Sequence, residues 1–402
     1  MDLVSPEVVG HHCRVGTLAY RLGEAAGLPG RTLTELILAG LLHDVGAFSL
    51  KDRLAALAFD SDDKTHAEIG YRLLAGYKGF ACAAGLVRAH HAPWADGRAS
   101  GKVSAPEAEL ANLLSLADRV DALLPRTPGQ HVDREAVVSR IRSGRGRLFK
   151  PEWVDVFETL ISQRGFWEQL LAAGAAQACL IIPDEFNPVL PGRDISSLSR
   201  LFSQIIDFRC RFTATHSCGV AAMSVALGRE MGLPEPRLEW MEIAGELHDI
   251  GKLGVPSEII LKPAALDHDE MTVMRGHAAN GYSVLFGVPG MNEMAVWVGQ
   301  HHERLDGTGY PRGENASLIG LESRVLAVSD VFTALTEDRP YRQGLSLNQT
   351  VSLLNDMAGG NLLDRDVVGA LLGRLTDMDA LRRESQARAL ADFELFARGL
   401  AR

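Results

Sequence analysis

The chain has 402 residues, enough for two or three domains with cores of their own, which excludes a small disulfide-stapled module. Hydrophobic residues make up 46% and charged residues 23%, values that exclude a disordered or collagen-like chain. The net charge of -10 argues against binding to duplex DNA or RNA, because such binders usually present a basic face.

The cysteines and the N-terminus predict a protein of the reducing cytoplasm. No C-x-x-C pair and no regular spacing occurs among Cys13, Cys82, Cys179, Cys210 and Cys218, so neither a disulfide framework nor a zinc knuckle is indicated. The first residues lack the basic and apolar regions of a signal peptide. No apolar run approaches the roughly 18 to 20 residues that span a bilayer, so we expect a soluble protein with no membrane span.

Helical periodicity runs through nearly the whole chain. In segment 31–46 apolar residues recur at three- and four-residue spacing up to Gly46, and segment 237–251 repeats this design. In the second segment the same spacing places His248 on the inward face of the helix. Only residues 178–183 suggest an extended piece, so the predicted fold class is all-α.

A linker is predicted at 183–194, because the prolines and glycine of PDEFNPVLPGRD cannot share one helix. It separates a first domain, 1–182, from a second, 195–376, whose first helix would be capped by Asp194. Residues 377–402 are predicted to form one terminal helix.

Histidines and aspartates occur twice in the same order. The first set is His12, His43, Asp44, His66, His90, His91 and Asp118, and the second is His216, His248, Asp249, His277, His301, His302 and Asp330. Equivalent positions lie 204 to 212 residues apart, which chance does not readily produce. Imidazole and carboxylate suit Mn, Fe, Co, Ni or Zn, and a cluster of this size exceeds what one tetrahedral ion needs. Two ions bridged by an aspartate would use it.

The second half resembles the HD-GYP branch of the HD-domain metal-dependent phosphohydrolases. The resemblance rests on HDIGKLGVP (248–256), HHERLDGTGYP (301–311) and DVFTALTEDRPYR (330–342), and it covers about 195–375. It implies two tandem HD-type helical bundles in a bacterial signalling protein, the first bundle a degenerate HD domain. It also implies hydrolysis of a cyclic dinucleotide, either cyclic di-GMP or 3′,3′-cyclic GMP-AMP.

The same resemblance assigns the metal ligands. His216, His248, Asp249 and Asp330 would hold one divalent ion, and Asp249 would bridge to a second ion held by His277, His301 and His302. Iron or manganese is expected first, with nickel, cobalt, zinc or magnesium as alternatives. The cluster His12, His43, Asp44, His66, His90, His91 and Asp118 is a possible metal site of the first half.

Substrate contacts are expected next to these ligands. Lys252 lies one turn beyond Asp249, where an ammonium offsets charge on the scissile phosphate, so Asp249 and Lys252 are the predicted catalytic residues. The substrate loop would contain Gly307, Gly309, Tyr310 and Pro311. Arg339 and Arg342 would grip a second phosphate or a guanine edge, with a salt bridge on the helix surface as the alternative.

Departures from the family pattern refine these expectations. Phe212 stands where some members carry a glutamate that joins a third metal, which favours two ions and the linear dinucleotide as main product. Thr333 replaces a second aspartate found in many members. Ala47 stands in the first half where Lys252 stands in the second, so the first half is expected to regulate or dimerise and not to catalyse.

Two other function classes stay open. The chain would be a binding module if the GYP region engages other signalling proteins without turnover. A homodimer is a separate expectation for the chain. The chain would be an HD nucleotidase if it cleaves a nucleoside triphosphate or a guanosine alarmone, although the GYP motif argues against this.

Overall fold

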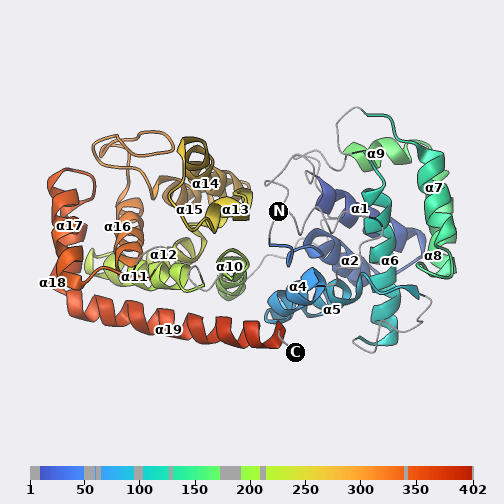
Figure 1. Cartoon of the computed structure of the whole chain (residues 1–402), viewed down its shortest axis with the longest axis horizontal. Helices are drawn as coiled ribbons and strands as arrows, with labels where there is room; N and C mark the ends of the chain where they lie inside the picture. Colours follow the sequence, from blue (N-terminus) through green and yellow to red (C-terminus); the bar gives the residue numbers. More distant parts are fainter. Residues whose placement is uncertain are drawn as a thin grey trace. The chain divides into compact units, whose positions relative to one another are not determined.

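The computed structural model describes residues 10–48, 59, 65–94, 103–125, 130–172, 192–208, 214–338 and 343–400. The chain divides into two compact units, an N-terminal unit of residues 1–189 and a C-terminal unit of residues 190–402. Each unit is a bundle of helices (Figure 1).

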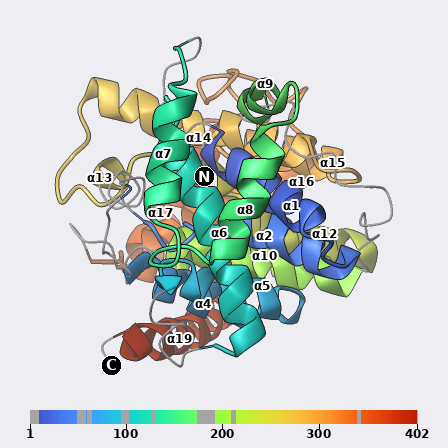
Figure 2. The ribbon, with the colours of Figure 1, turned by 90° about the vertical axis from the view of Figure 1, so that its right-hand side faces the viewer.

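The N-terminal unit is built on two pairs of helices and the long α6. Helix α1 packs on α2 and α6, and α4 packs on α5 (Figure 2). Its helices are α1 (His11–Ala25), α2 (Gly30–Leu42), α4 (Thr65–Ala75), η1 (Lys78–Phe80), α5 (Ala81–Ala89), α6 (Ala105–Ala122), α7 (Arg134–Ser143), α8 (Pro151–Ile161) and α9 (Phe166–Ala172).

The C-terminal unit has α11 at its centre, in contact with α12, α16 and α19. Its helices are α10 (Gly192–Asp207), α11 (His216–Glu230), α12 (Glu235–Leu247), η4 (Ile250–Gly254), α13 (Ser257–Ile260), α14 (His268–Phe286), α15 (Asn292–Gln300), α16 (Leu321–Thr336), α17 (Leu347–Gly359), α18 (Arg365–Gly373) and α19 (Leu375–Leu400).

The all-α prediction is confirmed. The described residues form no strand, only two isolated bridges, Arg145 with Phe149 and Asp306 with Asn315. The extended piece expected at 178–183 lies outside the described residues, as does the expected linker up to residue 191. Helix α10 begins at Gly192, two residues before the expected Asp194. Among the described helices we find none both long and apolar enough to cross a membrane.

In each unit one close contact between two helices depends on a glycine. A Cβ on Gly40 of α2 would lie 2.5 Å from the Cα of Gly16 in α1, and a Cβ on Gly245 of α12 would lie 2.4 Å from the Cα of Ala221 in α11. No side chain larger than hydrogen fits between these backbones. The two units therefore use the same device to bring α1 against α2 and α11 against α12.

Two helices end earlier than the sequence predicts. Helix α2 ends at Leu42 and α12 at Leu247, so the pairs His43-Asp44 and His248-Asp249 lie just past helix ends. His248 keeps helical backbone angles and is buried, as its spacing predicts. A Cβ on Gly251 would lie 1.8 Å from the carbonyl oxygen of His277, so this turn lies directly on α14.

The close contact at Gly245 makes a prediction about stability. Gly245→Ala should lower the free energy of unfolding by about 1–3 kcal/mol or more, because the added methyl forces the α11 and α12 backbones apart. Gly369→Ala on α18, where a Cβ meets nothing within 4 Å, should instead raise it by about 0.5–1 kcal/mol. Denaturant unfolding of both variants checks the pair, and equal effects would contradict the contact.

Candidate metal centres

The seven residues predicted in the second half converge in the C-terminal unit. His216 begins α11, His248 and Asp249 follow α12, and His277 lies on α14. His301 and His302 follow α15, and Asp330 lies on α16. All are buried except His302, whose side chain is 27% exposed. Five separate elements thus supply one cluster.

The C-terminal cluster has two parts, and one part surrounds the imidazoles of His216 and His248. The Nε2 of His216 lies 3.2 Å from Asp330 Oδ1. The Nε2 of His248 lies 3.9 Å from the same oxygen and 3.4 Å from Asp249 Oδ2. In the other part of the cluster, the Nε2 of His277 lies 3.3 Å from His301 Nε2 and 3.4 Å from Asp249 Oδ1.

Asp249 therefore directs one carboxylate oxygen at each half, which is the geometry of a bridging ligand. An ion that holds ligands at about 2.0 to 2.2 Å in tetrahedral geometry sets them about 3.3 to 3.6 Å apart. Most of the separations in the cluster fall in or near this range, so the residues fit two divalent ions.

Backbone carbonyls fix which nitrogen of each ring faces the cluster. The Nδ1 atoms of His248, His277 and His301 donate to the carbonyls of Gly245, Met274 and Val298, each three residues earlier. A carbonyl only accepts, so Nδ1 holds the proton and the neutral ring keeps its Nε2 lone pair. The Nε2 of His248 is buried without a hydrogen-bond partner, as expected of a metal ligand.

The electrostatics favour the ligating forms of Asp249, His301 and His302, whereas Asp249 and Asp330 raise the pKa of the buried His248 against the effect of burial. Burial alone would raise the pKa of Asp249, but Lys252 and His248 bring that pKa well below its usual range. Burial lowers the pKa of His302 to about 3, although Asp330 opposes this shift. Burial and the neighbouring imidazoles also bring the pKa of His301 well below its usual value.

Lys252 and the Gly307–Pro311 loop border the cluster. The Lys252 Nζ lies 2.5 Å from Asp249 Oδ2, and the Lys252 side chain is 20% exposed. The Tyr310 ring lies over His302 at 4.8 Å between centroids, and its backbone N–H donates to the His302 carbonyl. Gly307 has a φ of 81°, and a Cβ on Gly309 would lie 2.4 Å from the backbone nitrogen of Arg304. Gly307 therefore permits a positive φ that other residues rarely adopt, and Gly309 permits the close approach of the loop to the backbone of Arg304.

Two carboxylates that the sequence analysis did not single out support this arrangement. Glu303 is buried and accepts hydrogen bonds from the backbone N–H groups of Arg312 and Glu314, which closes the loop. Glu337 Oε1 lies 2.9 Å from the Nδ1 of His216 and so faces the side of the ring away from Asp330. The Glu337 carboxylate thus places a negative charge beside the Nδ1 of His216.

In the N-terminal unit the structure places His11 in the cluster at the position expected for His12. The Nε2 of His11 lies 3.2 Å from His43 Nε2 and 3.6 Å from Asp44 Oδ2. His12 is buried beside the cluster, its ring centroid 5.5 Å from that of His43. His11 precedes His216 by 205 residues, the same distance that separates His43 from His248, so an exact offset would have identified it.

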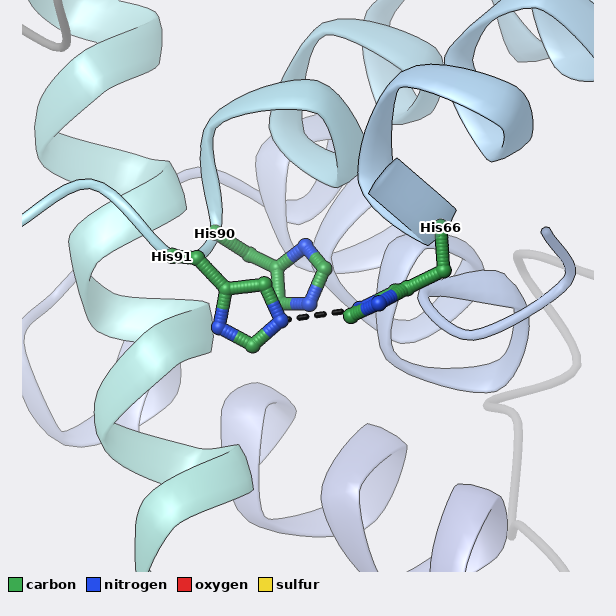
Figure 3. Close-up of side chains that lie close together, drawn as sticks. All are labelled: His66, His90 and His91. Carbon is green, nitrogen blue, oxygen red and sulfur yellow. Dashed lines mark hydrogen bonds between the residues drawn. The ribbon is translucent and has the colours of Figure 1, made fainter. Parts of the chain in front are cut away.

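The other expected residues of the first half do gather. Asp118 Oδ1 lies 3.6 Å from His43 Nε2, and Asp44 Oδ1 lies 3.3 Å from His66 Nε2. The rings of His66, His90 and His91 point toward one another from α4 and the end of α5 (Figure 3). Three other predicted positions, Phe212, Arg339 and Arg342, lie outside the described residues.

The chain matches two family models, each described as "HD domain", one over residues 8–123 and the other over residues 200–367. It is 32% identical over 382 residues to a 3′3′-cGAMP-specific phosphodiesterase of Vibrio cholerae, covering 92% of this chain and 88% of that protein. It is 36% identical over 185 residues to a cyclic di-GMP phosphodiesterase response regulator of Xanthomonas campestris, covering 45% of this chain and 48% of that protein.

A solved structure shares the fold across nearly the whole chain. The crystal structure of a cyclic GMP-AMP specific phosphodiesterase of V. cholerae superposes with a TM-score of 0.60 at 22% identity, covering 94% of this chain and 96% of that one. The repeated family match and the long alignment agree with the two similar clusters described above. The chain therefore belongs to the HD-domain phosphodiesterases, as a member of the HD-GYP type with two HD domains in tandem.

Proposed function

We propose that the C-terminal unit hydrolyses a 3′,3′-linked cyclic dinucleotide, cyclic GMP-AMP or cyclic di-GMP, to the linear dinucleotide. The observation that carries this proposal is that Lys252 and Tyr310 border the same cluster of seven ligand-type side chains. The relatives with printed activities act on these two substrates.

The chain's own residues would divide the chemistry as follows. His216, His248, Asp249 and Asp330 would hold one divalent ion, and Asp249, His277, His301 and His302 a second, iron or manganese by expectation. When bound, two such ions activate water near neutral pH and offset charge on the attacking and leaving oxygens. Lys252 would donate to a non-bridging oxygen of the scissile phosphate. Tyr310 would offer its ring to a base, and Arg339 and Arg342 a second phosphate contact.

A substrate panel tests this proposal. Metal-reconstituted protein should convert cyclic GMP-AMP or cyclic di-GMP to the linear dinucleotide and form mononucleotide slowly, because Phe212 supplies no carboxylate for a third ion. A nucleoside triphosphate and a guanosine alarmone belong in the same panel. Turnover of only the nucleoside triphosphate or the alarmone would make the chain a nucleotidase. Binding of the cyclic dinucleotides without turnover would make it a binding module.

The contact between Glu337 and His216 predicts an effect on metal affinity. Glu337→Gln leaves every ligand in place but removes the charge behind the His216 ring, so the Kd for Mn²⁺ should rise about 10- to 100-fold. Gln386 donates to the other oxygen of Glu337, and Gln386→Ala should leave the Kd nearly unchanged. Metal titration of both variants measures this, and equal affinities for Glu337→Gln and wild type would contradict the role.

Lys252→Ala separates phosphate handling from metal binding. The variant should keep a normal metal content while kcat falls about 100- to 1,000-fold, because the lost charge acts mainly in the transition state. Asp249→Ala should lose metal and activity together. Lys262→Ala, which removes an ammonium paired with Glu270, is the control and should retain the wild-type rate. Full metal with an unchanged rate in Lys252→Ala would remove this lysine from the mechanism.

The N-terminal unit is expected to regulate or dimerise, since Ala47 stands in place of the lysine. Asp44→Ala should therefore leave most of the phosphodiesterase rate intact in a steady-state assay. A loss as deep as that in Asp249→Ala would show that the N-terminal unit takes part in catalysis.

A further inference from the structure

The N-terminal cluster contains an arginine at a position where the C-terminal cluster has none. Arg119 follows Asp118 on α6, and the residue that follows Asp330 on α16 is Val331. Arg119 is only 5% exposed, so its charge is buried together with the imidazoles.

One half of the N-terminal cluster has the dimensions of a metal site. Its donor atoms are His11 Nε2, His43 Nε2, Asp44 Oδ2 and Asp118 Oδ1, and the measured separations among them run from 3.2 to 3.7 Å. Ligands held tetrahedrally at about 2.0 to 2.2 Å lie about 3.3 to 3.6 Å apart. His43 Nδ1 donates to the carbonyl of Gly40, which leaves the Nε2 lone pair for an ion.

In the other half of the N-terminal cluster, which contains His66 and His91, Arg119 fixes the position of the ring protons. An Nη atom of Arg119 lies 2.7 Å from His91 Nδ1, and a guanidinium has donors only, so Nδ1 must accept. The proton of the neutral His91 ring is then on Nε2, which lies 2.8 Å from His66 Nε2 (Figure 3). That proton occupies the lone pair of His66, so neither Nε2 atom is free to bind an ion.

The C-terminal cluster shows no such contact among its described residues. The Nδ1 of His302 lies 3.8 Å from Asp330 Oδ2, whereas in the N-terminal unit Arg119 contacts both His91 and, at 3.5 Å, Asp118 Oδ2. The guanidinium thus contacts both His91 and Asp118, whose counterparts His302 and Asp330 lie 3.8 Å apart in the C-terminal unit. Its fixed positive charge also repels a second cation.

We propose that the N-terminal unit binds a single divalent ion through His11, His43, Asp44 and Asp118, and that Arg119 replaces the second ion. A centre with one ion cannot clamp both the attacking and the leaving oxygen of a phosphodiester, so the unit retains metal binding without the two-ion chemistry. This inference does not depend on the substrate of the C-terminal unit.

Metal counting on the full chain tests the proposal. A background variant with His248, Asp249 and His301 replaced by Ala removes the C-terminal cluster as a competitor for metal. The probe is Mn²⁺. After desalting, elemental analysis should find one Mn²⁺ per background chain and three per wild-type chain. Electron paramagnetic resonance of the background variant should show an isolated ion without spin coupling.

Arg119→Val, which introduces the residue found at position 331, should raise the background count from one to two and produce a spin-coupled pair. The control Arg142→Val removes an exposed arginine of α7 and should leave the count at one. In the wild-type chain Val331→Arg should lower the count from three to two.

Two ions or none in the background variant would overturn the proposal, as would a count of one after Arg119→Val. If the background variant does not fold, the wild-type count and Val331→Arg still decide the matter. A wild-type count of four, or three ions in Val331→Arg, would overturn it.

Discussion

The hydrogen bonds from imidazole Nδ1 to a carbonyl three residues earlier orient the rings of both histidine and aspartate clusters. The last carbonyls of a helix have no intrahelical partner. His43, His90, His248 and His301 each stand at the residue that follows a helix, and each ring satisfies such a carbonyl. One bond thus completes the helix end, orients the ring and leaves Nε2 with its lone pair. The positions of helix ends therefore decide where the ligands lie.

The aspartate that follows the first of these histidines joins the two halves of each cluster. Asp44 and Asp249 each direct one oxygen to one half and the other oxygen to the second half. This is possible because Gly46 and Gly251 let the following turn lie against the backbone of α4 and α14. A larger residue there would displace the bridging carboxylate from one of its two sets of partners.

Both units have these histidines and this aspartate in the same arrangement, but they differ in the charged groups that contact the cluster. His11 has Asp121 at 2.6 Å from its Nδ1, whereas Thr333 occupies the corresponding position in the C-terminal unit and Glu337 approaches His216 instead. The N-terminal unit buries two arginines, Arg14 and Arg119, next to its cluster. The C-terminal unit instead has a partly exposed lysine beside its bridging aspartate. The buried arginines favour a closed site, whereas the partly exposed ammonium of Lys252 can reach a substrate phosphate.

The sequence by itself determined the all-helical class, the repeat and the residues that gather in the C-terminal cluster, because helical spacing and the order of the repeated histidines and aspartates are visible along the chain without knowledge of any contact. It missed His11, since two adjacent histidines differ only in which one faces inward. It also missed Glu303, Glu337 and Arg119, whose contacts with Arg312, His216 and His91 each join residues nine or more positions apart in the chain. Contacts between distant elements carry no periodic signal. Only the tertiary structure decided which charges contact the imidazoles. The packing of α6 against the end of α5 brings Arg119 to His91, and the packing of the residue after α16 against the start of α11 brings Glu337 to His216.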